Sequence, residues 1–344
     1  MKMRGRAIHI FLLMVMGGSS FRSFSQDIHF SQFFEAPLLR NPSLAGIYKG
    51  DIRVQAVYRD QWNSVTNAYK TGSLNGEYKM PIGKADDFFT LGLQLLYDRA
   101  GTIGWTSVHV LPAINYHKSL SADRNRYLSL GFMGGLVQRS FDRSKMTTDT
   151  QYPTGGTGPD GENNLASAKY SYLDGSVGMS YNSSINDNPD NNYFVGVAYH
   201  HFNRPNYSFY RDPAIELHPK WVFSGGVRFV VGDYAYMTIQ ADHSRQGGFN
   251  ETIGGAMYGL KIGGDPEHPA YTLHAGTYLR WNDALIPVIK LDYVPFSFAL
   301  SYDVNISKLK PSSYGRGGFE LSLSYIGFLD RNNSSVNAVR CPRF

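Results

Sequence analysis

Tyr-Thr-Leu-His-Ala-Gly-Thr-Tyr-Leu-Arg-Trp, residues 271–281, alternates two kinds of side chain along the chain. Successive side chains of a β-strand point to opposite faces, so the odd-numbered residues share one largely apolar face, whereas His274, Gly276 and Arg280 share the other. The same alternation recurs at residues 91–98 and 319–325. One face suits lipid and the other suits water. This pattern is typical of strands that cross a membrane as part of a β-barrel.

Alternating runs of this kind occur between turn signals along most of the chain. We predict strands at 52–62, 68–80, 88–99, 105–118, 126–139, 168–182, 192–203, 219–231, 234–244, 249–262, 270–281, 284–293, 295–306 and 317–329. Their number, about fourteen, is even, as a closed antiparallel barrel of one chain requires. The predicted fold is therefore an all-β transmembrane antiparallel barrel of about 14 strands. A large soluble β-sandwich or propeller remains the alternative, because it also alternates.

The N-terminus carries the features of an export signal. A basic start precedes an apolar run from Ile8 to Met16, and small residues then end at Ser25, which predicts cleavage before Gln26. The predicted organisation is a signal peptide at 1–25, an N-terminal plug or periplasmic segment at 26–50, an outer-membrane barrel at 51–330 and a C-terminal tail at 331–344. The expected location is the outer membrane of the cell.

Composition excludes several classes of protein. Hydrophobic residues make up 42% of the chain and the mean hydropathy is −0.31, an average that a barrel with one apolar and one polar face also gives. The 24 Tyr, 21 Phe and 36 Gly suit aromatic girdles and a coiled sheet. The net charge of +5 is scattered without a dense basic cluster, so we expect no nucleic-acid partner. Cys341 is the only cysteine, which excludes an intrachain disulfide.

The connections between strands predict a topology. If the first strand begins in the periplasm, the links after odd-numbered strands face outward, and Ser140–Ser167 is the longest of them. Its glycine-rich and polar sequence offers no apolar face to the barrel, so we interpret it as a recognition loop. Tyr152 and Pro153 form a rigid apolar anchor beside adaptable polar residues. The candidate partner-binding residues are Tyr152, Pro153, Asp160 and Asn163.

Residues 27–50 lack alternation, and Asn41-Pro42 marks a tight turn within them. We predict that they form a lumen plug or a periplasmic dock, with candidate residues His29, Phe30, Gln32, Phe33, Asn41 and Pro42. Charged residues on the inward face of the strands are the candidate lumen charges, namely Arg53, Arg59, Asp98, Arg228, Arg280, Asp303 and Glu320, with His274 and Lys290. Their mixed signs suggest ion pairs that brace the wall or hold a plug. A wet lumen with unpaired charges is the alternative.

Catalytic and metal sites receive little support. His200 and His201 precede Ser208 and Asp212, a spacing that a hydrolase could use. A strand end with its imidazoles at the headgroup level explains the two histidines better, and adjacent strand residues point to opposite faces, which excludes joint chelation. Carboxylates in the longest link, at Asp149, Asp160 and Glu162, are better explained as a solvated loop than as a calcium site. We therefore predict no enzyme activity, no cofactor and no metal.

Several motifs carry a resemblance to a known family. Residues 27–34 (Asp-Ile-His-Phe-Ser-Gln-Phe-Phe), 41–46 (Asn-Pro-Ser-Leu-Ala-Gly) and 58–62 (Tyr-Arg-Asp-Gln-Trp) resemble the entry sequence of the PorP/SprF family. Residues 199–205 and 301–309 resemble later parts of it in the same order. The resemblance implies an outer-membrane component of the type IX secretion system.

The same resemblance implies a function. It suggests a non-enzymatic role in secretion and gliding, in which the barrel binds or anchors an exported adhesin-type C-terminal domain at the cell surface. The implied partners are that exported surface protein and type IX secretion components, besides outer-membrane lipid. The alternative function is a porin-like channel for small solutes.

Overall fold

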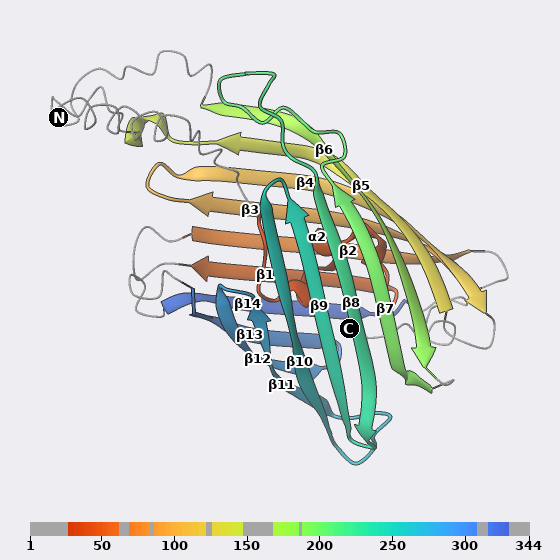
Figure 1. Ribbon diagram of the computed structural model, residues 1–344. Coiled ribbons are helices and arrows are strands. Elements are labelled where there is room, and N and C mark those ends of the chain that lie inside the picture. Colours follow the sequence, from red (N-terminus) through yellow and green to blue (C-terminus); the bar gives the residue numbers. More distant parts are fainter. Residues whose placement is uncertain are drawn as a thin grey trace, which may run out of the picture.

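Figure 1 shows a computed structural model of the chain, which describes residues 27–61, 69–82, 86–121, 126–146, 168–185, 188–307 and 316–329. The strands are β1 (Ile52–Gln61), β2 (Tyr69–Ile82), β3 (Asp87–Ala100), β4 (Trp105–Ser121), β5 (Arg126–Ser140), β6 (Lys169–Ile185), β7 (Asn188–His200), β8 (Lys220–Gly232), β9 (Ala235–Gln246), β10 (Phe249–Ile262), β11 (Tyr271–Arg280), β12 (Ala284–Tyr293), β13 (Phe296–Asn305) and β14 (Arg316–Gly327). Each pairs antiparallel with its neighbours in sequence, and β1 closes the barrel against β14. The predicted fourteen-stranded barrel is confirmed.

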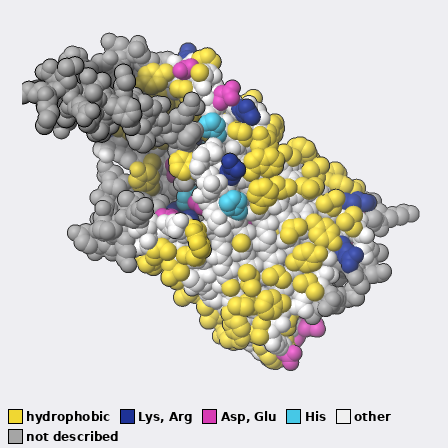
Figure 2. Space-filling view, viewed as in Figure 1, with side chains coloured by type: hydrophobic (Ala, Val, Ile, Leu, Met, Phe, Trp, Pro, Cys, Tyr) yellow, Lys and Arg dark blue, Asp and Glu magenta, His cyan; other side chains and the backbone are white. Residues whose placement is uncertain are grey.

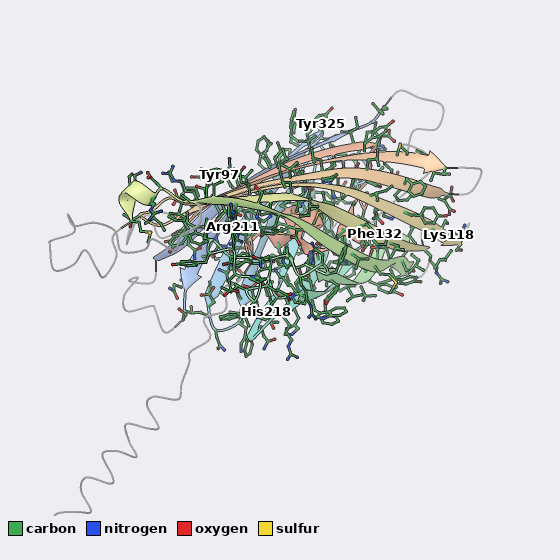
Figure 3. All side chains as sticks on the ribbon, turned by 90° about the horizontal axis from the view of Figure 1, so that it is seen from above. Tyr97, Lys118, Phe132, Arg211, His218 and Tyr325 are labelled. Carbon is green, nitrogen blue, oxygen red and sulfur yellow. The ribbon has the colours of Figure 1, made fainter. Side chains whose placement is uncertain are left out.

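Side-chain alternation separates the two surfaces of the wall. In β11, Leu273 is 40% exposed on the outer surface, whereas His274 is 6% exposed inside the barrel. Large apolar side chains cover the outer surface between the strand ends, as the yellow areas of Figure 2 show, and Tyr97 and Tyr325 project outward in Figure 3. Exposing such an apolar surface to lipid costs little free energy, whereas exposing it to water would cost much more. Among the described residues, no helix is long and apolar enough to cross a membrane.

The links differ in length at the two ends of the barrel. At one end most links are short, such as residues 186–187, 233–234 and 294–295, and the longest is 263–270. The other end has short links too, such as 247–248, but it alone has the two longest, 141–168 and 201–219. By the usual asymmetry of such barrels, we call the end with the long links the outer end and the opposite one the inner end. The strand predicted at 192–203 runs instead from Asn188 to His200, because the chain leaves the sheet at His201 with a left-handed φ of 57°.

The N-terminal segment, defined here as residues 27–50, lies inside the barrel (Figure 1). It contains three short helical turns, η1 (Phe33–Glu35), α2 (Pro37–Arg40) and η2 (Pro42–Leu44). Proline at the start of α2 and of η2 suits a helical turn, whose first N–H groups lack an intrahelical partner. The segment begins at the outer end, beside the end of β9, and reaches the inner end at Asp51, where that residue's N–H donates to the carbonyl of Gly327.

Candidate functional site

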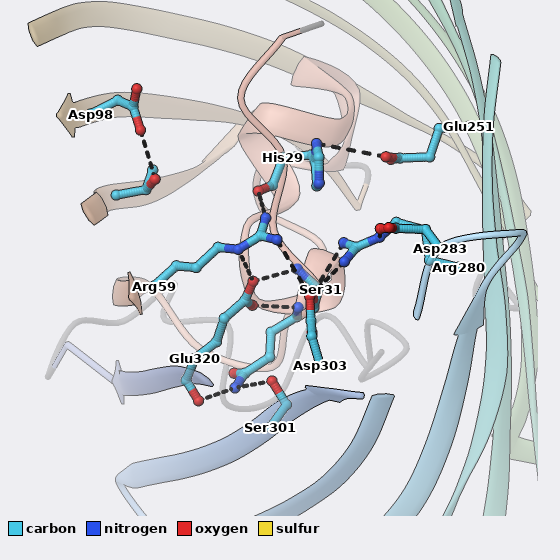
Figure 4. A network of polar contacts seen from close by, with 12 residues as sticks. His29, Ser31, Arg59, Asp98, Glu251, Arg280, Asp283, Ser301, Asp303 and Glu320 are labelled. Carbon is cyan, nitrogen blue, oxygen red and sulfur yellow. Dashed lines mark hydrogen bonds and ion pairs between the residues drawn. The ribbon is translucent and has the colours of Figure 1, made fainter. Parts of the chain in front are cut away.

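A network of polar contacts holds the beginning of the N-terminal segment to the wall (Figure 4). The carboxylate of Glu320, on β14, accepts hydrogen bonds from the backbone N–H groups of Ser31 and Gln32, both at 2.7 Å. Arg59, on β1, lies 3.3 Å from the Glu320 carboxylate and donates to the backbone carbonyl of His29 at 2.7 Å. Because Glu320 is fully buried, these charge-assisted contacts replace the water that an isolated carboxylate would need.

The same network extends to β11 and β13. Asp303 accepts hydrogen bonds from the Ser31 hydroxyl at 2.9 Å and from Arg280 at 2.5 Å, and Arg59 donates to it at 3.3 Å. Arg280 also donates to the Ser31 hydroxyl at 3.1 Å. The structure thus brings four of the predicted lumen charges, Arg59, Arg280, Asp303 and Glu320, together around one short stretch of the N-terminal segment.

Arg40 forms a second anchor in the middle of the barrel. Its guanidinium donates two hydrogen bonds to the carboxylate of Asp242, on β9, at 2.5 and 2.6 Å, and a third to Gln240 at 3.3 Å. The guanidinium also lies 4.6 Å from the ring centroid of Phe33. Both charged partners are buried, and the bidentate geometry is the one that guanidinium and carboxylate favour.

Glu35 supplies a third anchor, whose side chain is negatively charged, in contrast to that of Arg40. Its carboxylate accepts hydrogen bonds from Lys290 at 2.5 Å, from Gln55 at 2.9 Å and from Ser324 at 3.0 Å. Burial disfavours the charged form, but the neighbouring Lys290 lowers the pKa of Glu35 below its usual value. The carboxylate is therefore ionised at neutral pH and holds strands β1, β12 and β14 to the segment.

Small residues of the wall make room for the Asn41-Pro42 turn. A Cβ on Gly178 of β6 would lie 1.9 Å from the Asn41 side-chain oxygen, and one on Gly131 of β5 would lie 2.5 Å from Pro42. The Asn41 oxygen accepts from the N–H of Ser43 at 2.9 Å, while its amide nitrogen donates to two carbonyls of β6 and β7. The backbone of the segment thus lies directly on the bare backbone of the sheet.

The inner half of the segment is held by β2. Glu77 accepts a hydrogen bond from the N–H of Gly46 at 2.7 Å and binds Arg53 through both carboxylate oxygens. Lys79 donates to the carbonyl of Tyr48 at 2.7 Å. Gly46 has a φ of 82°, and its Cβ would lie 2.1 Å from a Thr90 oxygen, so both conformation and space require glycine there.

Apolar contacts fill the space between these anchors. Phe33 and Phe34 pack on the buried ring of Tyr278, with ring centroids 5.3 Å apart in both pairs. Leu38 and Ala45 pack against a second apolar group of the wall, which consists of Leu111, Ala113, Met133 and Val137. Because both surfaces are apolar there, the segment and the wall form shared hydrophobic clusters, in which the side chains of both pack closely.

The outer rim holds a separate cluster around His201. Its imidazole lies 2.6 Å from the carboxylate of Asp27 and 2.8 Å from that of Asp174, on β6. Lys220 lies 3.8 Å from Asp27. His200, in contrast, contacts the Ser176 hydroxyl at 2.9 Å and the carbonyl of Arg40 at 3.1 Å.

The observed positions of His200 and His201 differ from those predicted from the sequence. His200 and His201 were predicted to point to opposite faces at the headgroup level, but both are buried inside the barrel. The physical reason is the left-handed conformation of His201, which ends the strand and turns its side chain inward. The Ser208 hydroxyl accepts from the N–H groups of Tyr210 and Asp212 in its own loop, so the hypothesised nucleophile and bases engage different partners.

The loop after β7, residues 201–219, folds back on itself at the outer end. The N–H of Tyr207 donates to the carbonyl of Ile215, and Phe209 packs edge-on against Trp105 and Phe141 at 4.9 Å. Its exposed side chains include Phe202, Tyr210 and Arg211, and Arg211 is labelled in Figure 3. The loop therefore combines an aromatic base with an exposed face that carries aromatic side chains and charges of both signs, from Arg211 and Asp212 among others.

The remaining predicted residues lie elsewhere. Asp98 accepts a hydrogen bond from the Thr71 hydroxyl at 2.7 Å, and the guanidinium of Arg228 lies 3.6 Å from the ring centroid of Tyr236. The candidates Tyr152, Pro153, Asp160 and Asn163 are outside the described residues, as are the signal peptide, the whole C-terminal tail at 331–344 and the possible calcium ligands Asp149, Asp160 and Glu162. No group of three or more His, Cys, Asp or Glu residues suited to a metal ion occurs in the described part of the chain.

Sequence reasoning missed several charged residues that hold the N-terminal segment, among them Glu35, Arg40, Glu77 and Lys79. Arg40 and Glu35 belong to a segment without periodicity, so their direction was not predictable. Glu77 and Lys79 do share a face of β2 with other polar residues, and the same parity rule that selected Arg53 would have selected them.

Comparisons with known proteins give a family and a fold. The family model described as type IX secretion system membrane protein PorP/SprF matches residues 22–325. No curated protein matches the chain. Among solved structures, the Pseudomonas putida toluene transporter TodX is similar with a TM-score of 0.52 at 11% identity, over 91% of this chain and 99% of that one. The Ralstonia pickettii toluene transporter TbuX has a TM-score of 0.50 at 8% identity, over 85% and 92%. At these identities the likeness concerns the fold alone.

Proposed function

The chain belongs to the PorP/SprF family of type IX secretion system membrane proteins, and we propose that this outer-membrane barrel binds or anchors an exported protein at the cell surface without catalysing a reaction. The proposed ligand is an adhesin-type C-terminal domain, presented to the outer loops after its secretion. Components of the secretion system would meet the short links at the inner end.

The observation that carries this proposal is the occupied interior. A solute channel requires a continuous aqueous path, whereas here an apolar core and buried ion pairs join the N-terminal segment to strands around the wall. Cavities between segment and wall measure about 50 and 80 Å³, enough for a few water molecules. We therefore propose that residues 27–50 act as a plug, and that binding is the task of the outer surface.

The exposed face of the loop at 201–219 has the side chains of a protein-binding surface. Phe202, Tyr210 and Arg211 are exposed, and aromatic residues and arginine dominate the energetics of protein interfaces. The packed base of the loop, Phe209 against Trp105, fixes their position before a partner arrives, which lowers the entropic cost of binding. We propose that this loop and the link at 141–168 contact the exported protein together.

Affinity isolation from detergent-solubilised membranes tests this function. The native barrel should co-purify with an exported surface protein, and replacing residues 148–165 by a short Gly-Ser link should reduce that yield while the barrel still assembles. Arg211→Ala with Tyr210→Ser should reduce it as well. Lys118→Ala, an exposed change at the inner end, is the matched control and should leave the yield unchanged. An unchanged yield in both loop variants would contradict the proposed binding surface.

Conductance separates anchoring from the porin-like alternative. In planar bilayers the native barrel should remain closed, whereas removal of Asp27 to Asn41 should raise the conductance of a still-folded barrel. Steady conductance of the native barrel, together with no co-purifying exported protein, would favour the channel.

A further inference from the structure

The first residues of the N-terminal segment lie at the outer end of the barrel. The backbone N–H of Asp27 donates to the side chain of Gln246 at 3.1 Å, and Gln246 is the last residue of β9. Lys220, 3.8 Å from the Asp27 carboxylate, is the first residue of β8. Both strands have these termini at the outer end, where residues 201–219 and 247–248 connect them to their neighbours.

The last residues of the segment lie at the opposite end. Asp51 accepts a hydrogen bond from the N–H of Leu329, beyond the end of β14, and its carbonyl accepts from the N–H of Lys79 near the end of β2. The chain therefore runs through the barrel from the outer to the inner end before β1 returns outward. A segment that merely docked from the periplasm would have its first residues at the inner end.

The surroundings of Asp27 have the composition of a carboxylate-binding site. His201 presents one ring nitrogen to Asp27 at 2.6 Å, while Asp174 accepts at the other ring nitrogen and fixes the orientation of the ring. Asp174 also accepts from the N–H of Gly175 at 2.9 Å. Lys220 adds a second positive charge beside Asp27, so two cationic and two anionic side chains balance in a largely buried place.

The protonation of these groups agrees with that arrangement. Burial disfavours the imidazolium, but the two neighbouring carboxylates raise the pKa of His201 to about 10. Burial likewise disfavours the Asp27 carboxylate, yet His201 and Lys220 hold its pKa well below the usual value. At neutral pH both partners are charged, and the contact is a charge-assisted hydrogen bond.

We propose that the beginning of the N-terminal segment lies on the outer side of the membrane, where Asp27 occupies a carboxylate-binding site built by His201, Asp174 and Lys220. The N-terminal segment is thus latched at the cell surface, and its first residues form part of the face that outside molecules meet. This inference rests on the path of the chain and not on any exported partner, so it stands or falls separately from the proposed function.

Cysteine labelling tests the path, in a Cys341→Ser background that removes the only native thiol. A membrane-impermeant maleimide should label Ile28→Cys on intact cells. Lys49→Cys lies in the same segment and is exposed at the inner end, so it should react only after the outer membrane is breached. Phe202→Cys, exposed in the outer loop, shows that the reagent reaches the surface. If Ile28→Cys stays unlabelled on cells that label Phe202→Cys, the outer placement is wrong.

The latch is tested in the same Ile28→Cys protein. His201→Gln and, separately, Asp27→Asn should each increase the labelling rate roughly tenfold, which corresponds to about 1.4 kcal/mol less favourable closure. Asp27→Asn leaves the wall untouched, so it remains informative if the His201 variant folds poorly. His268→Gln, the same substitution at an exposed site of the inner end, should leave the rate unchanged. Unchanged labelling in Asp27→Asn would overturn the carboxylate site.

Discussion

Glu320→Gln should release the beginning of the N-terminal segment without unfolding the barrel. The native carboxylate receives two backbone N–H groups, from Ser31 and Gln32, both at 2.7 Å, and lies beside the guanidinium of Arg59. Glutamine has the same shape but one acceptor oxygen, so its NH₂ group must face either a backbone donor or the guanidinium. Because the site is fully buried, no water can compensate.

The expected magnitude follows from these contacts. A hydrogen bond to a charged group contributes about 1.5–3 kcal/mol, and the substitution removes one such bond and weakens the other. We expect the free energy of local opening around Ser31 and Gln32 to fall by about 2–3 kcal/mol. That change corresponds to an amide exchange rate roughly 100-fold higher at these two positions.

Hydrogen exchange of the purified barrel measures this effect, with heat-modifiable electrophoretic mobility as the check that the barrel is folded. Glu251→Gln is a matched control at the same end of the barrel. Its carboxylate lies 3.6 Å from the imidazole of His29. Burial together with Arg59 holds the pKa of His29 well below its usual value, so these two side chains do not form an ion pair at neutral pH. Native exchange rates at Ser31 and Gln32 in Glu320→Gln would refute the anchoring role of the carboxylate.

Three further substitutions probe the outer surface, the close contact and the central ion pair. Leu273→Arg places a charge on the outer face and should cost roughly 2–4 kcal/mol of barrel stability near the bilayer midplane, measured by denaturant unfolding in lipid. Gly178→Val should displace Asn41 from the wall and cost about 1–3 kcal/mol, with faster exchange of the amides that follow Asn41. Arg40→Met should cost about 3–5 kcal/mol, because it leaves Asp242 buried without its cation, and the double variant with Asp242→Leu should recover part of this loss in the same unfolding measurement.

Two of these substitutions, Leu273→Arg and Gly178→Val, have a matched change that should behave differently. His274→Arg changes the inner face of the same strand and should be tolerated because the new guanidinium can donate to the carboxylate of Asp292, which lies 2.9 Å from the native imidazole. Gly76→Val is a change of the same kind with no atom within 4 Å of the new Cβ, and should cost less than Gly178→Val. Equal losses of folded barrel within either pair would mean that the assigned faces or contacts are wrong.

The strands were predictable because each one carries its own signal. Side chains in 271–281 alternate because one face of the strand contacts lipid and the other faces the polar interior of the barrel. This pattern can be recognised from neighbouring residues alone. The same rule failed at His201, where one left-handed residue ended the strand and turned a side chain inward. Nothing in the local sequence required that conformation. It is stabilised by Asp27, which lies 174 residues away.

The N-terminal segment shows the complementary case. Absence of alternation set residues 27–50 apart from the predicted strands. It gave no direction for the side chains of Glu35 and Arg40, whose partners lie on β12 and β9. The role of Gly131 and Gly178 was not predictable either. Each glycine makes room for the Asn41-Pro42 turn, and the sequence does not show that this turn packs against them. Contacts between distant parts of a chain need the fold itself before they can be assigned.

The distribution of the anchors determines how the segment could leave the barrel. The network at Glu320, the ion pair of Arg40 and the contacts of Glu77 hold separate parts of the segment to different strands, and an apolar core lies between them. Loss of one anchor should therefore loosen its own few residues and leave the others in place. An open pore would require several anchors to break together. The free energy needed for this is the sum of their contributions, so thermal fluctuations would open the pore only rarely. A single-anchor variant that exchanged amides throughout the segment, or that conducted ions, would indicate one cooperative unit instead.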